Sequence, residues 1–165
     1  MRLNHSFVMA VVVAAVLGPV RLQGQVLTER NVSTQLALTM ANAAIAACKG
    51  DGYDVSVVVV DRAGEVKLLM RADTANPHNA DLARRKAYTA RTFGVPSMEV
   101  AKRTNGPTEL SGQRFITDII PLGGGLPIMI GTDKIGGIGL SGGPTQEADE
   151  KCAKAGLAAV AASLR

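Results

Sequence analysis

Residues 123–150 read GGGLPIMIGTDKIGGIGLSGGPTQEADE, and nine of the chain's eighteen glycines lie in the first 21 positions of this stretch. Within it, GIGLSG at 137–142 matches G-x-G-x-x-G, the glycine pattern of dinucleotide-binding loops. Such a loop joins a strand to a helix in a βαβ unit, and an acidic residue about 20 positions later holds the ribose. Here Gly137 and Gly139 fall inside a predicted strand, and Ala162 occupies the position of that acid. The stretch therefore does not predict a nucleotide site.

The glycines instead leave one face of a predicted β-hairpin with few side chains. Its strands cover residues 126–130 and 135–140, joined by a turn at 131–134. A glycine inside a strand removes a side chain from one face of the sheet, which allows another backbone or a flat ligand to approach. Two explanations stay open: a covering helix crowds these positions, or a ligand or neighbouring subunit contacts them.

A capped helix is predicted to follow the hairpin. Thr145 is the expected N-cap of a helix over residues 145–163, after a turn at 142–144. Glu147, Asp149 and Glu150 fall in the first turns, where negative charge interacts favourably with the helix dipole. We therefore interpret these carboxylates as dipole partners rather than catalytic groups.

The rest of the chain predicts one domain of mixed α and β structure. A chain of 165 residues usually builds a single core. Hydrophobic patterning indicates helices over 28–49, 80–92 and 97–103, strands over 54–60 and 66–71, and a loop or short strand over 116–120. Hairpin-linked strands and helices in separate blocks indicate an α/β (α+β) fold with a mainly antiparallel, five-stranded sheet whose faces are covered by helices.

The first 24 residues, MRLNHSFVMAVVVAAVLGPVRLQG, resemble a signal peptide. They have a basic start, an apolar run over 7–17 and a break at Gly18-Pro19. We expect cleavage near Gly24, a single domain over 25–165 and a periplasmic or secreted protein, with a retained membrane anchor as the alternative. Removal of Arg2 and Arg21 lowers the formal net charge from +4 to +2. Since only 3% of residues are aromatic, neither charge nor stacking favours a nucleic-acid partner.

The two cysteines, Cys48 and Cys152, are candidates for a disulfide. One ends the first predicted helix and the other lies near the start of the last. Two helices packed antiparallel on one sheet face would bring these ends together, and disulfides persist in exported proteins. Two buried thiols are the alternative. There is no C-x-x-C pair, so a redox motif or zinc ribbon is not supported.

His78 is the one histidine that remains after removal of the leader. It follows Pro77 and precedes the second predicted helix, so a His-rich metal site is excluded and a Ser-His-Asp triad would have to include it. A neutral imidazole can serve as an axial haem ligand, although a lone loop histidine is often simply solvated. The basic run Arg84, Arg85 and Lys86 could meet haem propionates by charge-assisted hydrogen bonds, or form an ordinary solvated helix face.

Three blocks of the sequence resemble the GlcG/HbpS family, whose domain is also called DUF336 or haem-degrading. They are VSVVVVDRAGEVKLLMRAD, PHNADLARRKAYTARTFGVPS and GGGLPIMIGTDKIGGIGLSGGPTQEADEKCAKAGL, and the resemblance covers residues 28–163. It implies a three-layer, profilin-like α/β/α sandwich, a homo-oligomer and, in several members, haem binding. His78 falls where many haem-binding relatives carry Pro-His, but Asn79 replaces a common threonine. No catalytic residue is carried over.

The leading functional hypothesis is an exported haem-binding protein that sequesters or senses haem or iron. His78 would be the iron ligand, with Arg84, Arg85 or Lys86 near the propionates. Any haem breakdown would be coupled oxidation by the bound iron, because the sequence offers no reductase or oxygenase apparatus. The alternatives are an accessory protein or enzyme that binds a small carboxylate of glycolate or diol metabolism, with Arg71 or Arg91 as the clamp, and a purely structural oligomerisation module.

Overall fold

The computed structural model describes residues 24–165, so nearly all of the predicted signal peptide lies outside the described residues. The elements are α1 (Thr34–Gly50), β1 (Ser56–Val60), β2 (Val66–Arg71), α2 (Asn79–Phe93), α3 (Ser97–Arg103), η1 (Ser111–Phe115), β3 (Gly125–Ile130), β4 (Asp133–Ser141), α4 (Gln146–Ala158) and η2 (Ala161–Leu164). Among these helices, none has the length and apolar character needed to cross a membrane.

The sheet has four strands, in the order β2-β1-β4-β3, and every neighbouring pair is antiparallel. Residues 116–120, which were expected to form a loop or a short strand, form a loop, so the predicted five-stranded sheet is wrong. Side chains of α2 bind the backbone there: Arg85 donates to the Ile119 carbonyl oxygen at 2.9 Å, and the Ile120 N–H donates to Thr89 Oγ1 at 2.9 Å. Because these contacts satisfy the buried polar groups, the segment lies along the helix instead of pairing with β3.

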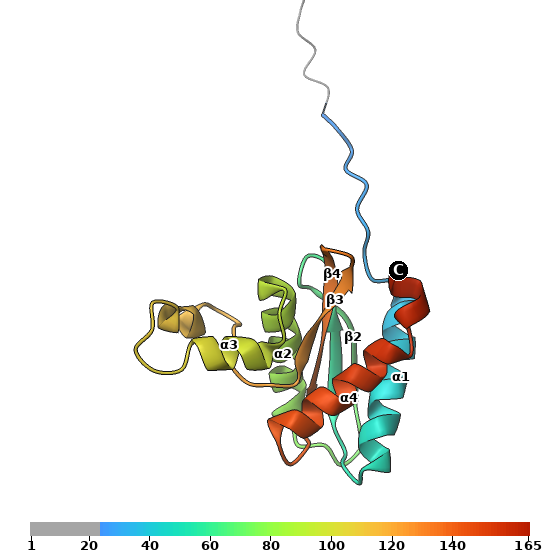
Figure 1. The fold of residues 1–165 in the computed structure, drawn as a ribbon. Coiled ribbons are helices and arrows are strands. Elements are labelled where there is room, and N and C mark those ends of the chain that lie inside the picture. Colours follow the sequence, from blue (N-terminus) through green and yellow to red (C-terminus); the bar gives the residue numbers. More distant parts are fainter. Residues whose placement is uncertain (1–23) are drawn as a thin grey trace, which may run out of the picture.

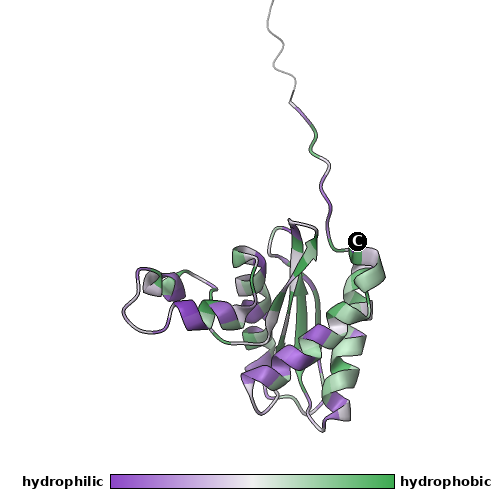
Figure 2. Ribbon diagram, in the orientation of Figure 1, coloured by the Kyte–Doolittle hydropathy of each residue, from purple (hydrophilic) through white to green (hydrophobic). Residues whose placement is uncertain are grey.

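The sheet lies between two helical layers, with α1 and α4 on one side and α2 on the other (Figure 1). Side chains of β1 alternate between them. Val57 and Val59 join the main core with α1 and α4, whereas Val58 and Val60 pack against Ala83 and Ala87 of α2. Hydrophobic residues line the strands, and hydrophilic ones concentrate on α3 and the first half of α4 (Figure 2). The structure thus has the predicted three-layer order.

The backbone of α2 lies directly on the glycine positions of β3 and β4. A Cβ added to Gly125, Gly137 or Gly139 would come closer than 3.0 Å to a backbone oxygen of α2. The carbonyls concerned belong to Lys86, Ala87 and Ala83, respectively. Of the two explanations for the glycines, crowding by a covering helix is therefore confirmed at these positions.

The first and last helices differ from their predicted bounds at one end each. Ser33 caps α1 by accepting a hydrogen bond from the Leu36 N–H, so the helix starts at Thr34 and not near residue 28. Arg62 holds the preceding segment, since its N–H donates to Asn31 Oδ1 at 3.0 Å. Thr145 caps α4 as predicted, but this helix ends at Ala158 and the chain continues as the η2 turn.

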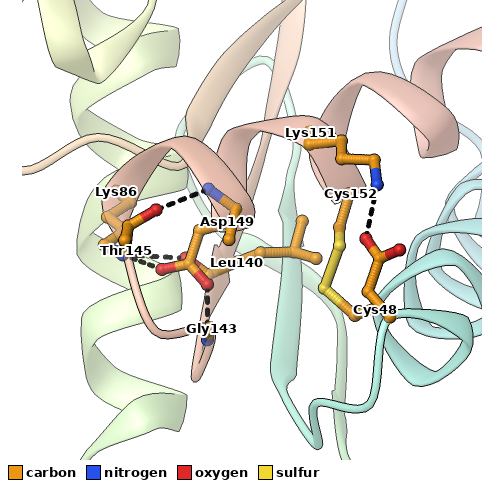
Figure 3. Close-up of a disulfide and its surroundings, with 10 residues drawn as sticks. Cys48, Lys86, Leu140, Gly143, Thr145, Asp149, Lys151 and Cys152 are labelled. Carbon is orange, nitrogen blue, oxygen red and sulfur yellow. Dashed lines mark hydrogen bonds and ion pairs between the residues drawn. A yellow bond between two sulfur atoms is a disulfide. The ribbon is translucent and has the colours of Figure 1, made fainter.

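A disulfide joins Cys48 at the end of α1 to Cys152 in α4, which confirms the predicted pair (Figure 3). Both residues are fully buried, and their Cα atoms are 5.6 Å apart. Beside the bond, Lys151 Nζ lies 2.6 Å from Asp51 Oδ2. Covalent and ionic contacts therefore fasten the two helices of this layer at the same end.

We predict that Gly139→Ala lowers the free energy of unfolding by about 1–3 kcal/mol, because the new methyl group would overlap backbone atoms of α2. Urea denaturation measures the change. Gly112→Ala is the matched control, since a Cβ there meets no atom within 4 Å, and it should stay within about 0.5 kcal/mol of the wild type. Equal effects of both substitutions would contradict the close packing.

We predict that the double variant Cys48→Ala, Cys152→Ala loses about 2–5 kcal/mol of unfolding free energy, because the bond closes a loop with a sequence separation of 104 residues. The reductant dependence of the urea midpoint should be present in the wild type and absent in the variant. Two free thiols in mass spectrometry under non-reducing conditions would contradict the bond.

Candidate functional site

His78 occupies the N-cap position of α2, on the surface of the protein. Its side chain makes no capping hydrogen bond, in contrast to Ser33 and Thr145 at the starts of α1 and α4. The next residue, Asn79, is buried and anchors the helix start to the end of β4, where Ser141 Oγ lies 3.4 Å from Asn79 Oδ1. The imidazole is thus exposed on a backbone that is held in place.

Arg84 and Arg85 lie six and seven residues after His78, which is about 9–10 Å along the helix axis. Arg84 forms ion pairs with Asp81 at 3.0 Å and Asp118 at 2.7 Å. The hydrogen bond from Arg84 lowers the pKa of the Asp118 carboxyl. Each guanidinium carries five N–H donors, and these contacts, with that of Arg85 to Ile119, leave some donors on each without a protein partner.

Lys86 lies inside the protein, so the expectation that it meets a haem propionate does not fit its position. Its Nζ is 2.7 Å from Asp149 Oδ2 and donates to the Leu140 carbonyl oxygen at 3.0 Å (Figure 3). The side chains of the pair are only 4% and 5% exposed. Burial raises the pKa of the Asp149 carboxyl, while the ammonium of Lys86 and the N–H of Gly143 lower it.

The Lys86–Asp149 pair joins the two helical layers at one end of the sheet. Asp149 was expected to act only on the dipole of α4, but it also accepts a hydrogen bond from the Gly143 N–H at 2.8 Å. One feature of the sequence indicated that Lys86 is buried. It lies three positions after Ala83 and four before Ala90, so it shares the small-residue face of α2 that packs on the sheet. Nothing local identified a partner 63 positions away.

The proposed carboxylate clamps lie at opposite ends of the sheet. Arg71 pairs with Ser56 at one end of β1, and Arg91 lies against Gly137, the partner of Val60 at the other end. A hollow of about 250 Å³ beside Arg71 is also lined by Lys49, with Asp54 and Asp73. The two arginines therefore cannot share one ligand, and of the two only Arg71 lines this hollow.

The described residues offer few groups that could bind the iron of a haem. No group of three or more histidine, cysteine, aspartate or glutamate side chains among residues 24–165 is placed to hold a metal ion. His78 could supply one axial nitrogen, which is the number that a five-coordinate haem needs. It lines none of three surface hollows, which have volumes of about 430, 430 and 250 Å³. Among the described residues, His78 is therefore the side chain that could hold a haem iron, and it would do so outside these three hollows.

Comparisons with known proteins agree on one family. A family model described as haem degrading protein HbpS-like matches residues 32–158. A crystal structure of a double mutant of HbpS from Streptomyces reticuli superposes with a TM-score of 0.78 at 35% identity, covering 86% of this chain and 95% of that one. A structure called the PduOC:heme complex has a TM-score of 0.74 at 26% identity, covering 79% and 95%.

A curated relative from Citrobacter freundii is 31% identical over 128 residues, which is 76% of this chain and 89% of the relative. It is described as an uncharacterized 15.0 kDa protein from the region between dhaT and dhaS.

We predict that Lys86→Met lowers the free energy of unfolding by about 3–5 kcal/mol, because it leaves the Asp149 carboxylate buried without its partner. The double variant Lys86→Met, Asp149→Leu should recover most of that loss. Urea denaturation of Lys86→Met, of Asp149→Leu and of the double variant measures the coupling between the two side chains. Simple additivity of the two changes would contradict a direct interaction.

Proposed function

Because the chain belongs to the HbpS-like family of haem-degrading proteins, we propose that it binds haem, with His78 as the axial ligand of the iron. The observation that carries the proposal is the exposed imidazole at the start of α2, which makes no capping hydrogen bond. His78 is also the only histidine among residues 24–165. A structural relative that is named as a haem complex supports the same ligand class.

The residues of α2 would bind and orient the haem. His78 would hold the iron, which supplies electron-transfer and ligand-binding chemistry when haem is present. Arg84 and Arg85 would direct their remaining guanidinium donors to the propionates, through charge-assisted hydrogen bonds. Lys86 would act indirectly, because its pair with Asp149 positions the helix.

We further propose that the protein is exported and sequesters or senses haem in the periplasm or outside the cell, as a homo-oligomer. The buried disulfide between Cys48 and Cys152 supports an oxidising compartment, since such bonds are rare in reducing ones. A binding role fits better than catalysis, with any haem breakdown as coupled oxidation.

A small carboxylate is the second candidate ligand. Lys49 and Arg71 line the hollow of about 250 Å³ and could hold an anion, although Asp54 and Asp73 in the same hollow oppose it. The place of the Citrobacter relative between dhaT and dhaS motivates a test with small hydroxy acids. If neither ligand class binds, a purely structural oligomerisation module is the remaining candidate.

We predict that haemin gives the purified protein a sharpened Soret band, and that His78→Ala weakens binding at least tenfold, or ~1.4 kcal/mol. Arg84→Ala and Arg85→Ala should weaken binding less, because each removes donors to a propionate and leaves the bond from His78 to the iron in place. Lys102→Ala is the control, since that side chain is 66% exposed on α3 and pairs with Glu99.

Two outcomes of this titration would contradict the proposal, and each would reject a different part of it. An unchanged haemin spectrum in the wild type would reject haem as the ligand. An identical Soret band in His78→Ala would reject this residue and leave haem binding in place.

A further inference from the structure

The hollow of about 250 Å³ at the end of α1 combines an apolar patch with charges of both signs. Its large apolar residues are Ile45 of α1 and Met70 of β2, which are partly buried and pack against the main hydrophobic core. Its charged residues are Lys49, Arg71, Asp54 and Asp73. A pocket of this kind, apolar with a few polar groups at its edge, is typical of a small-molecule site.

The four charged residues of this hollow do not neutralise one another. Of the ion pairs formed within residues 24–165, none includes any of the four. Asp54 accepts a hydrogen bond from the Thr74 hydroxyl, which carries no charge. The larger hollow between α3 and α4 differs, because Lys102 and Lys154 form ion pairs there with glutamates that line the same hollow. The charges of the smaller hollow therefore remain available to a ligand.

The backbone that carries these charges is held in place on both sides of the hollow. Lys49 lies in the last turn of α1, where its carbonyl oxygen accepts a hydrogen bond from the Gly52 N–H at 3.0 Å, and the preceding Cys48 forms the disulfide. After β2, the Ala72 N–H donates to the Val55 carbonyl oxygen at 3.0 Å and ties the two acidic segments together. Because the backbone is already ordered, binding a ligand would cost little conformational entropy there.

We propose that this hollow binds a free α-amino acid with an apolar side chain. Its ammonium group would lie near Asp54 and Asp73, its carboxylate near Lys49 and Arg71, and its side chain against the apolar patch. A simple anion is repelled by the two aspartates and a simple cation by the two basic residues, whereas a molecule that carries both charges can form charge-assisted hydrogen bonds with both sets.

The size of the hollow agrees with a ligand of this class. Its volume of about 250 Å³ lies below the roughly 300–1,000 Å³ of sites for drug-sized molecules, so it suits a single amino acid better than a longer peptide. The proposal does not depend on haem binding. It changes the second candidate of the preceding subsection, a small carboxylate, by requiring an ammonium group on the same molecule.

Isothermal titration calorimetry of the purified protein with L-leucine tests the proposal. Two analogues remove one charge each: 4-methylpentanoate has the same carbon chain and carboxylate but no ammonium group, and leucinamide keeps the ammonium group but has no carboxylate. We expect leucine to bind about tenfold more tightly than either analogue, because each analogue leaves one set of charges in the hollow without a partner.

Two variants place the ligand in this hollow. Lys49→Gln and Asp73→Asn change exposed side chains, so the fold should be retained, and each should weaken leucine binding about threefold or more. Asp73→Asn should at the same time strengthen the binding of 4-methylpentanoate, because it removes a repelling charge. Lys154→Gln is the control, since that side chain is 66% exposed and lines the hollow between α3 and α4.

Three results would overturn the proposal. The first is an absence of binding heat with leucine at millimolar concentration. The second is binding of 4-methylpentanoate as tight as that of leucine, which would support a plain carboxylate ligand instead. The third is unchanged leucine binding in both Lys49→Gln and Asp73→Asn. Haemin should bind Lys49→Gln as it binds the wild type, so the outcome for this hollow stays separate from that of the haem proposal.

Discussion

Direct contact between the backbone of α2 and the backbone of β3 and β4 is the constraint on which the structure depends. Helix and sheet can approach so closely only because Gly125, Gly137 and Gly139 carry no side chains. The helix places His78 at one end of the sheet, and its outer surface receives the segment that was expected to form a fifth strand. The close approach of α2 at these glycines thus fixes where the start of the helix, with His78, lies relative to the sheet.

The two sides of the sheet are stabilised by different means. On the α2 side, a small cluster of Val58, Val60, Ala83 and Ala87 is supplemented by the buried pair between Lys86 and Asp149. On the other side, a larger apolar core and the disulfide hold α1 against α4. Desolvation opposes the attraction within a buried ion pair, so the net stability that the pair adds is smaller than its short distance suggests. Its place near the start of α4 therefore suits a role in alignment.

Local patterns predicted most of the fold but only part of the site. The hairpins, the Thr145 cap and the covering of the glycine positions follow from β-branched runs, capping chemistry and the absence of side chains. The apolar residues at 116–120 were compatible with a loop or a short fifth strand, and the loop forms because backbone groups there bind side chains of α2, which no local pattern reveals. Lys86 resembled its basic neighbours because its partner is distant in sequence. Local sequence patterns thus failed mainly to predict polar contacts between residues that are distant in the sequence.

The bond between Cys48 and Cys152 turns the intervening chain into a closed covalent ring that contains the whole sheet, α2, α3 and an arm formed by residues 104–118. A single cut in the arm by a protease would open this ring without separating the protein into pieces. The cut chain would have new ends at the arm while its original ends remained attached through sulfur. Residues 104–118 can therefore be exposed to a protease without a single cut dividing the molecule into two pieces.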